Sequence, residues 1–405
     1  DRRGKWLFYP ALAATSLMAV VLPASDSRTA WIAVALSSVC IVVWQYEIGA
    51  YVKRIWNRFP VASWMAALLV IVIVGGVSYG LFHYKEASGC GRLLLWKITV
   101  MAGLDHQPLG VGAGGFAATY ADSQASYFAS GGGSDTERLV AGSPEYAFNE
   151  YAQLLLEQGV GGLLLFLLLI GGGIVYCYRN RAYGVAGSWI AFAVVSFASY
   201  PLRLPPFLLV LMVMTAWTAS GVGGGVRVRG KWLLVPALLI LGVLIAGMKD
   251  QSERPALYRK WVNTRLTKQP ERYAELYDAL RHDPRYLFDY AKCLTDDEQY
   301  AEAIPLFEVA AKLSADPMIY NVMGRCHQEM ENYTKAEECF IHSSRILPER
   351  LYPFYLLMKL YGVSGDEGKQ LEYARVVLTK EPKVDSQAVK DMKKEAEEVI
   401  NGLSK

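Results

Sequence analysis

The most informative segment of the chain is Glu145–Leu168, EYAFNEYAQLLLEQGVGGLLLFLL. It places Asn149, Glu150, Gln153 and Glu157 at the beginning of a segment that is otherwise as apolar as a membrane-spanning helix. Positions 149, 153 and 157 recur every four residues, so on a helix they share one face. Because carboxylates and amides are costly in a bilayer unless they face a cavity or a partner, the stretch predicts a functional site. The alternative is a helix that begins among the lipid headgroups with polar residues in its first turn.

The composition of the chain divides it into two parts. Long apolar runs dominate residues 7–248, whereas residues 249–405 are charged and typical of a soluble domain. We therefore expect an all-α protein, with a polytopic helical membrane domain over residues 1–250, a linker over 251–270 and helical repeats over 271–400.

The charge balance and the cysteines exclude two classes of site. A net charge of +3 without a basic stripe and interleaved aromatic residues argues against a nucleic-acid partner. The six cysteines contain no CxxC pair and no Cys/His ligand spacing, which argues against a zinc site. The chain starts at Asp1 without an initiator Met, and we expect further membrane spans upstream of it.

Seven segments are candidate membrane spans, and each can cross about 30 Å of hydrocarbon. They lie near residues 7–24, 31–47, 64–82, 152–177, 184–201, 204–220 and 232–248. Basic residues cluster at alternate connections, which predicts that these connections are cytoplasmic. The clusters are Arg2, Arg3 and Lys5; Lys53, Arg54 and Arg58; Arg179 and Arg181; and Arg227, Arg229 and Lys231. Loop 83–151 and the C-terminal part would then lie in the periplasm of a multi-pass bacterial inner-membrane protein.

Residues 284–350 repeat at a spacing of 33 residues. The matched pairs are Leu287 and Tyr320, Ala291 and Gly324, Tyr300 and Tyr333, Ala303 and Ala336, Phe307 and Phe340, and Leu313 and Ile346. Small residues at a helix crossing and an aromatic residue at the turn are similar to tetratricopeptide (TPR) repeats, which form an α-solenoid. We expect a helix at 271–282 as the second half of an earlier repeat, a degenerate repeat at 351–382 and a capping helix at 384–401.

Two questions about the repeats stay open at this point. Such stacks bind a peptide or a neighbouring protein on their concave face, or they serve only as a rigid spacer. Cys293 and Cys326 occupy equivalent positions, with Cys339 on the partner helix, so an oxidising compartment permits a disulfide. Buried free thiols at small-residue positions are the favoured interpretation.

The predicted external loop contains a glycine pattern and two arginines of interest. Gly110, Gly112 and Gly115 satisfy GxGxxG, but no buried strand precedes them, so they predict a tight turn and no dinucleotide site. Arg92 and Arg203 both fall near the external leaflet, and prolines on both sides of Arg203 restrict its backbone. A guanidinium at that depth suits a bidentate grip on phosphate or pyrophosphate. The alternatives are snorkelling to headgroups for Arg203 and a solvated helix start for Arg92.

Taken together, several short motifs resemble the O-antigen ligase and polymerase superfamily, which includes bacterial O-linked oligosaccharyltransferases. The motifs are Arg92-x3-Trp96, His106-Gln-Pro-Leu-Gly-Val-Gly, Phe148-Asn149-Glu150-Tyr151, Glu157-x-Gly159-x-x-Gly162 and Ser199-Tyr200-Pro201-Leu-Arg203-Leu-Pro205. The resemblance covers roughly residues 60–220, and it rests on the order, the spacing and the predicted side of the membrane.

The resemblance implies a membrane glycosyltransferase of the GT-C type that uses no metal or other cofactor. Its donor would be a glycan on an undecaprenyl-pyrophosphate carrier, and its acceptor would be lipid A core, a protein or the growing glycan. Arg92 and Arg203 would hold the pyrophosphate with Lys97 nearby, because cationic groups stabilise a leaving group where charge develops. Asn149 and Glu150 would lie beside the sugar or the acceptor, with Glu157 as a further substrate-binding candidate. Of the two alternatives for the repeats, the binding surface would be the one that gives them a periplasmic protein partner.

One position departs from the family pattern. Many members have His directly before the Asn-Glu pair, where it is suited to deprotonate the acceptor. This chain has Phe148 there. The catalytic candidates are therefore Glu150 and His106; otherwise leaving-group activation suffices, or transfer activity is lost. A polysaccharide polymerase, a non-catalytic anchor that displays the repeats, and a transporter are the competing functions.

Overall fold

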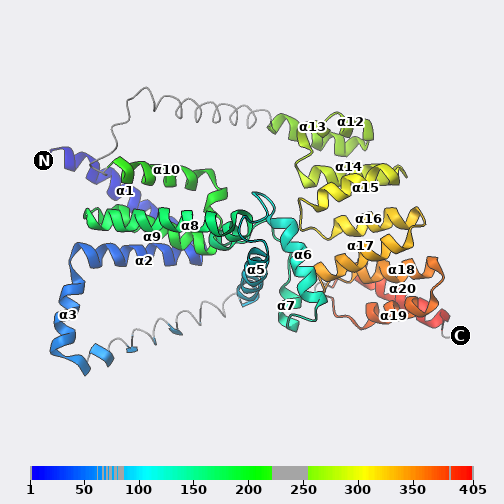
Figure 1. Cartoon of the computed structure of the whole chain (residues 1–405), viewed down its shortest axis with the longest axis horizontal. Helices are drawn as coiled ribbons and strands as arrows, with labels where there is room; N and C mark the ends of the chain where they lie inside the picture. Colours follow the sequence, from blue (N-terminus) through cyan, green and yellow to red (C-terminus); the bar gives the residue numbers. More distant parts are fainter. Residues whose placement is uncertain are drawn as a thin grey trace. The chain divides into compact units, whose positions relative to one another are not determined.

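The computed structural model describes most of the chain, and every regular element in the described residues is a helix (Figure 1). The described residues are 2–220 and 254–403, without 62, 66–67, 70–71, 73–74, 77–79, 81–85 and 383–384. The chain forms two compact units. The first unit comprises Asp1–Gly89, His106–Gly110 and Tyr146–Gly223, and the second comprises Cys90–Asp105, Val111–Glu145 and Gly224–Lys405.

The first unit contains the apolar helices. They are α1 (Arg2–Ala24), α2 (Arg28–Gln45), α3 (Ile48–Arg58), α8 (Glu150–Arg179), α9 (Tyr183–Ala198), the short 3₁₀ helix η1 (Pro201–Arg203) and α10 (Pro205–Ser220). Among the described residues, α2 and α8 are long and apolar enough to cross a membrane, and three shorter apolar helices accompany them. The predicted span 64–82 lies mostly, and the span 232–248 wholly, outside the described residues.

Helix α9 packs against both α2 and α8 (Figure 1). The approach of α8 and α9 is close at Gly173, where an added Cβ would lie 2.4 Å from the ring of Trp189. That indole is fully buried, and its Nε1 donates to Oγ1 of Thr218 on α10 at 3.2 Å. Small residues at such crossings allow the dense packing that holds apolar helices together in a lipid environment.

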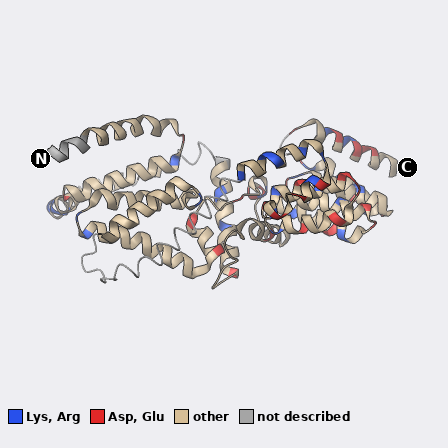
Figure 2. Cartoon of the chain, turned by 90° about the horizontal axis from the view of Figure 1, so that it is seen from above, with Lys and Arg blue, Asp and Glu red and all other residues tan. Residues whose placement is uncertain are grey.

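The second unit joins most of the predicted external loop to the C-terminal helices. The loop contributes α5 (Glu86–Asp105), α6 (Phe116–Ala129) and α7 (Asp135–Val140). The C-terminal helices are α12 (Pro270–Ala274), α13 (Tyr277–Leu280), α14 (Pro284–Asp296), α15 (Tyr300–Ala311), α16 (Met318–Glu329), α17 (Tyr333–Ile346), α18 (Tyr352–Ser364), α19 (Glu367–Thr379) and α20 (Gln387–Leu403). From α14 to α20 each helix packs against the next one in the chain (Figure 1). Charged residues are sparse along the apolar helices of the first unit and frequent along this stack (Figure 2).

The structure corrects two predicted segments at the start of the stack. The predicted linker 251–270 is helical over 254–267, because Trp261 buries its ring against the core and meets Tyr286 edge-on at 6.0 Å. The single helix expected at 271–282 is divided into α12 and α13.

The matched small residues of the repeats lie where the helices cross. Ala291, Ala303 and Ala336 are fully buried, and a Cβ on Gly324 would meet the ring of Phe340 at 2.5 Å. This is the close approach that the 33-residue pattern predicts. The cysteines that the pattern placed in this core, Cys293, Cys326 and Cys339, are buried free thiols in the structure.

Candidate functional site

The polar cluster predicted at the start of α8 begins with a helix cap. Asn149 is the N-cap residue, and its Oδ1 accepts the backbone N–H groups of Tyr151 at 3.0 Å and Ala152 at 3.1 Å. Such a cap satisfies donors that have no partner within the helix. The structure therefore gives Asn149 a local role that is sufficient to explain an asparagine here.

The predicted polar face of α8 is confirmed by two buried side chains. Gln153 Nε2 donates to Oε1 of Glu157 at 3.2 Å, and Gln153 Oε1 accepts the backbone N–H of Ala147 at 3.1 Å. Only 2% of Gln153 and 4% of Glu157 is exposed. The amide thus connects the loop before α8 to a carboxylate one turn further along the helix.

Glu157 forms an ion pair with Arg203. Nη2 of Arg203 lies 2.6 Å from Oε2 of Glu157, and about a third of the arginine side chain remains exposed. The guanidinium also lies over the ring of Tyr146, 5.6 Å from its centroid. Arg203 is therefore held by a carboxylate and a ring rather than only extended toward lipid headgroups.

Glu150 fixes the segment that carries Arg203. Its Oε1 accepts the backbone N–H of Leu202 at 2.7 Å, and 2% of the residue is exposed. Tyr200 packs beside this contact, stacked on Tyr146 at 5.3 Å and edge-on to Phe148 at 5.1 Å. The first turn of α8 and the segment around η1 are thus joined by both polar and aromatic contacts.

The backbone at the family's histidine position is unusual. Phe148 has φ 50°, a left-handed conformation that is rare for a bulky residue. Such strain persists where the surrounding structure requires it and is concentrated at functional sites. Here it turns the chain directly into the capped start of α8.

Helix α8 has a kink just after Glu157 that was not predicted from the sequence. Gly159 has φ 67° and ψ −168°, and an added Cβ would lie 1.9 Å from the carbonyl oxygen of Pro108. Gln107 bridges the interrupted backbone: its Oε1 accepts from Val160 N–H at 2.7 Å and its Nε2 donates to the Leu155 carbonyl at 3.2 Å. The Glu157-x-Gly159 motif contributes to the family resemblance, but its pattern alone does not indicate that Gln107 is the partner of the broken helix.

Gly110, the first glycine of the GxGxxG pattern, lies in a turn against this kink. Gly110 has φ 72°, and a Cβ there would lie 2.6 Å from the Leu156 carbonyl oxygen. Its N–H donates to the carbonyl of His106 at 2.9 Å. The expected tight turn is confirmed at Gly110. His106, at the other end of this turn, is exposed.

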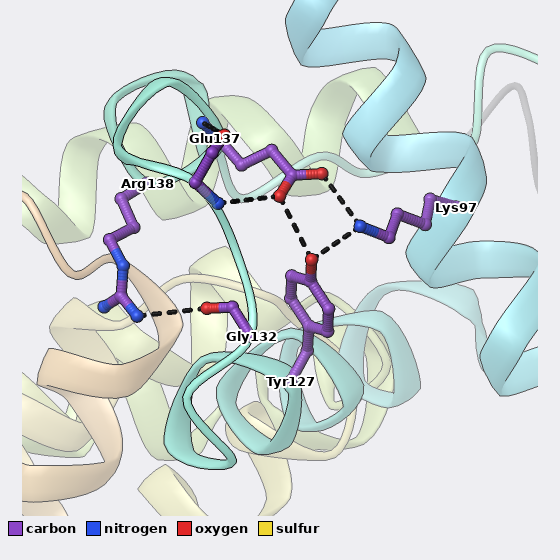
Figure 3. Close-up of polar contacts among 6 residues, drawn as sticks. Lys97, Tyr127, Gly132, Glu137 and Arg138 are labelled. Atoms are coloured by element: carbon purple, nitrogen blue, oxygen red, sulfur yellow. Dashed lines mark hydrogen bonds and ion pairs between the residues drawn. The ribbon is translucent and has the colours of Figure 1, made fainter.

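Two further predicted site residues, Arg92 and Lys97, lie on α5 in the second unit. Lys97 Nζ donates to Tyr127 Oη at 2.5 Å and to Glu137 Oε1 at 3.0 Å, while Tyr127 Oη donates to the other oxygen of Glu137 at 3.0 Å (Figure 3). The hydrogen bonds to Tyr127 and Glu137 raise the pKa of Lys97. Burial opposes ionisation of Glu137, but the Lys97, Ser134 and Tyr127 hydrogen bonds lower its pKa overall.

These contacts show that Lys97 ties α5 to α6 and α7. The tie is sufficient to explain a lysine at this position, and a role in substrate binding stays a prediction. Arg92 is half-buried on the same helix, and its predicted role likewise stays a prediction.

The first unit, all-helical in its described residues and with two helices long and apolar enough to cross a membrane, is consistent with a helical membrane domain, and it contains the Arg203–Glu157 ion pair. Residues 13–167 match the family model described as O-antigen ligase, which supports the O-antigen ligase superfamily for this part of the chain. At the family level the match indicates a membrane enzyme that transfers or polymerises glycans. It includes Asn149, Glu150 and Glu157 and ends before Arg203. No curated protein matches the chain.

Proposed function

We propose that the chain transfers a glycan from an undecaprenyl-pyrophosphate carrier to a lipid or protein acceptor at the periplasmic leaflet. The observation that carries this proposal is the Arg203–Glu157 ion pair in a region of apolar helices that matches O-antigen ligase up to residue 167. A guanidinium presents paired N–H donors in a geometry that fits phosphate oxygens. Arg203 is the cation that the described cluster offers to a pyrophosphate.

In this proposal Glu157 is the resting partner of Arg203. A carboxylate holds the guanidinium in place without donor, and the incoming pyrophosphate takes over some of its N–H groups. Because Gln153 donates to the same carboxylate, Glu157 retains a partner when Arg203 turns to the phosphate. The arginine then stabilises the negative charge that develops on the leaving group.

The transfer step follows from this arrangement. The acceptor hydroxyl oxygen attacks the anomeric carbon, the bond from that carbon to the phosphate oxygen breaks, and undecaprenyl pyrophosphate leaves with the electron pair. The hydroxyl proton passes to a base, for which Glu150 and His106 are the candidates. Glu150 is buried and accepts from Leu202, which suits positioning of the Arg203 segment, whereas exposed His106 is accessible to an acceptor.

Complementation of a gene deletion tests the proposal. Wild type, Arg203→Ala and Arg203→Lys are compared, with Arg179→Ala as a matched control at the opposite, exposed end of α8. Surface glycan and glycoprotein are read from the same cells, with expression measured. We expect one glycoconjugate class to disappear in the deletion, to return with wild type and Arg179→Ala, and to stay absent with Arg203→Ala.

The same experiment separates the competing functions. A polymerase uses the same donor but adds it to the growing glycan, so the deletion would shorten the glycan chains and leave short ones attached to their acceptor. Unchanged glycans in the deletion, or full activity of Arg203→Ala, would refute transfer and favour an anchor that displays the repeats.

A further inference from the structure

The second unit contains a cavity between the external-loop helices and the repeat stack. Helix α6 packs on α17, where buried Gln124 donates from Nε2 to the Ile346 carbonyl at 2.7 Å and to the Gly142 carbonyl at 3.0 Å. Beside this contact lies a cavity of about 290 Å³. Its principal lining residues are Phe128, Arg138, Arg345, Glu349, Phe354 and Lys380.

The cavity carries an excess of positive charge. Arg138, Arg345 and Lys380 contribute three cations, and Glu349 is the carboxylate among the lining residues. Lys380 Nζ lies 3.7 Å from Oε1 of Glu349, so these two charges largely offset each other. The two arginines then give the cavity its net charge, and paired guanidinium groups favour a carboxylate or phosphate ligand.

The structure holds one of these arginines in place before any ligand binds. Arg138 Nη2 donates to the Gly132 carbonyl at 3.0 Å (Figure 3), and its guanidinium lies 5.4 Å from the centroid of the Phe128 ring. Lys380 is placed in a similar way, 5.2 Å from the centroid of the Phe354 ring. Fixed cations lose less side-chain entropy on binding than mobile surface ones.

The volume and the aromatic walls indicate the ligand class. About 300 Å³ is the lower end for small-molecule pockets, which admits a single charged sugar but not a folded partner. The rings of Phe128 and Phe354 supply apolar surface for the C–H groups of a sugar, while the arginines supply donors for its acidic group. The choice of a sugar over an acidic peptide rests on the proposed function.

We propose that this cavity binds an acidic sugar of the glycan, with its carboxylate or phosphate held by Arg345 and Arg138. The external-loop helices α6 and α7 would then form one glycan-binding surface together with the repeat helices. This site would select or hold the glycan chain without taking part in the transfer step.

Calorimetric titration of the purified full chain in detergent tests the site without any transfer reaction. The probes are trigalacturonic acid for a sugar carboxylate, glucose 6-phosphate for a sugar phosphate, maltotriose as the neutral control and hexaglutamate as the acidic peptide. The variants are Arg345→Glu and, as a matched control, Arg375→Glu, an exposed arginine on α19 that is not a lining residue.

We expect saturable binding of trigalacturonic acid or glucose 6-phosphate, and the one that binds identifies the acidic group. Arg345→Glu should weaken it by about tenfold or more, because a charge-assisted hydrogen bond is replaced by repulsion, and Arg375→Glu should not. No saturable binding, equal losses in both variants, or tighter binding of hexaglutamate would overturn the proposal. Binding without transfer in cells would refute the proposed function but leave the acidic-sugar site intact.

Discussion

The guanidinium of Arg203 lies 2.6 Å from a carboxylate oxygen of Glu157, and the other oxygen of that carboxylate accepts from Gln153. Both oxygens therefore have protein partners, as a carboxylate needs when only 4% of its residue is exposed. A buried ion pair is costly to desolvate, and its presence is weak evidence for stability alone. In the proposed function, the pair holds a guanidinium that is available to the pyrophosphate.

The first prediction concerns the coupling of these two residues. Arg203→Ala should lower glycan transfer about 100-fold or more, since a donor aimed at developing charge is lost. Glu157→Gln should lower glycan transfer about tenfold, because the glutamine can still form hydrogen bonds but no longer forms an ion pair with Arg203. The double variant should be no worse than Arg203→Ala, which membrane-based transfer assays can measure. Additive losses would contradict a role for Glu157 through Arg203.

The second prediction concerns the kink in α8. Gly159→Ala forces an alanine into a conformation that is essentially restricted to glycine, and its Cβ would clash with the Pro108 carbonyl. We expect the apparent unfolding temperature of the full chain in detergent to fall by about 5 °C or more. Gly161→Ala is the matched control, because an added Cβ meets nothing within 4 Å there. Equal melting of the two variants would show that the kink is not required.

The sequence predicted the helical class and the polar face of α8 because both depend on local periodicity. Gln153 and Glu157 lie four residues apart, and their contact follows from helix geometry. The hydrogen bond between Gln107 and Val160 joins two segments that are far apart in the sequence, at the kink in α8. No short sequence pattern predicts such a contact. The helix at 254–267 was predicted as a linker because burial of Trp261 is decided by the repeat core and not by neighbouring residues.

The third prediction separates a structural role of Lys97 from a role in substrate binding. Lys97→Met and Glu137→Gln should each reduce unfolding free energy by less than about 1 kcal/mol, as for exposed ion pairs, and leave transfer within about twofold. The lowered pKa of Glu137 means that its contribution is complete above about pH 4.5 and is lost as pH falls through the folded-state pKa. The raised pKa of Lys97 means that its contribution is lost only above about pH 10.5. The stability difference between wild type and Glu137→Gln should therefore be constant from about pH 5 to 9 and shrink at more acidic pH. A large loss of transfer in Lys97→Met without loss of stability would instead favour substrate binding.

The fourth prediction tests the proposed periplasmic location of the repeats through thiol labelling. Burial raises the pKa of Cys326 and raises that of Cys339 to about 12, so neither should react with a maleimide in the folded chain. A background with Cys40→Ser and Cys90→Ser removes the half-buried thiols. Lys394→Cys, on an exposed face of α20, should then react with a membrane-impermeant maleimide in intact cells.

The control for this experiment is a residue on the side predicted to be cytoplasmic. Lys53 is exposed on α3, and Lys53→Cys should react only after the cells are permeabilised. Labelling of Lys53→Cys and not of Lys394→Cys in intact cells would invert the topology that the basic connections predict. The inverted topology would place the repeats and the acidic-sugar cavity in the cytoplasm. Arg203 would then lie on the cytoplasmic side as well, which would refute glycan transfer at the periplasmic leaflet.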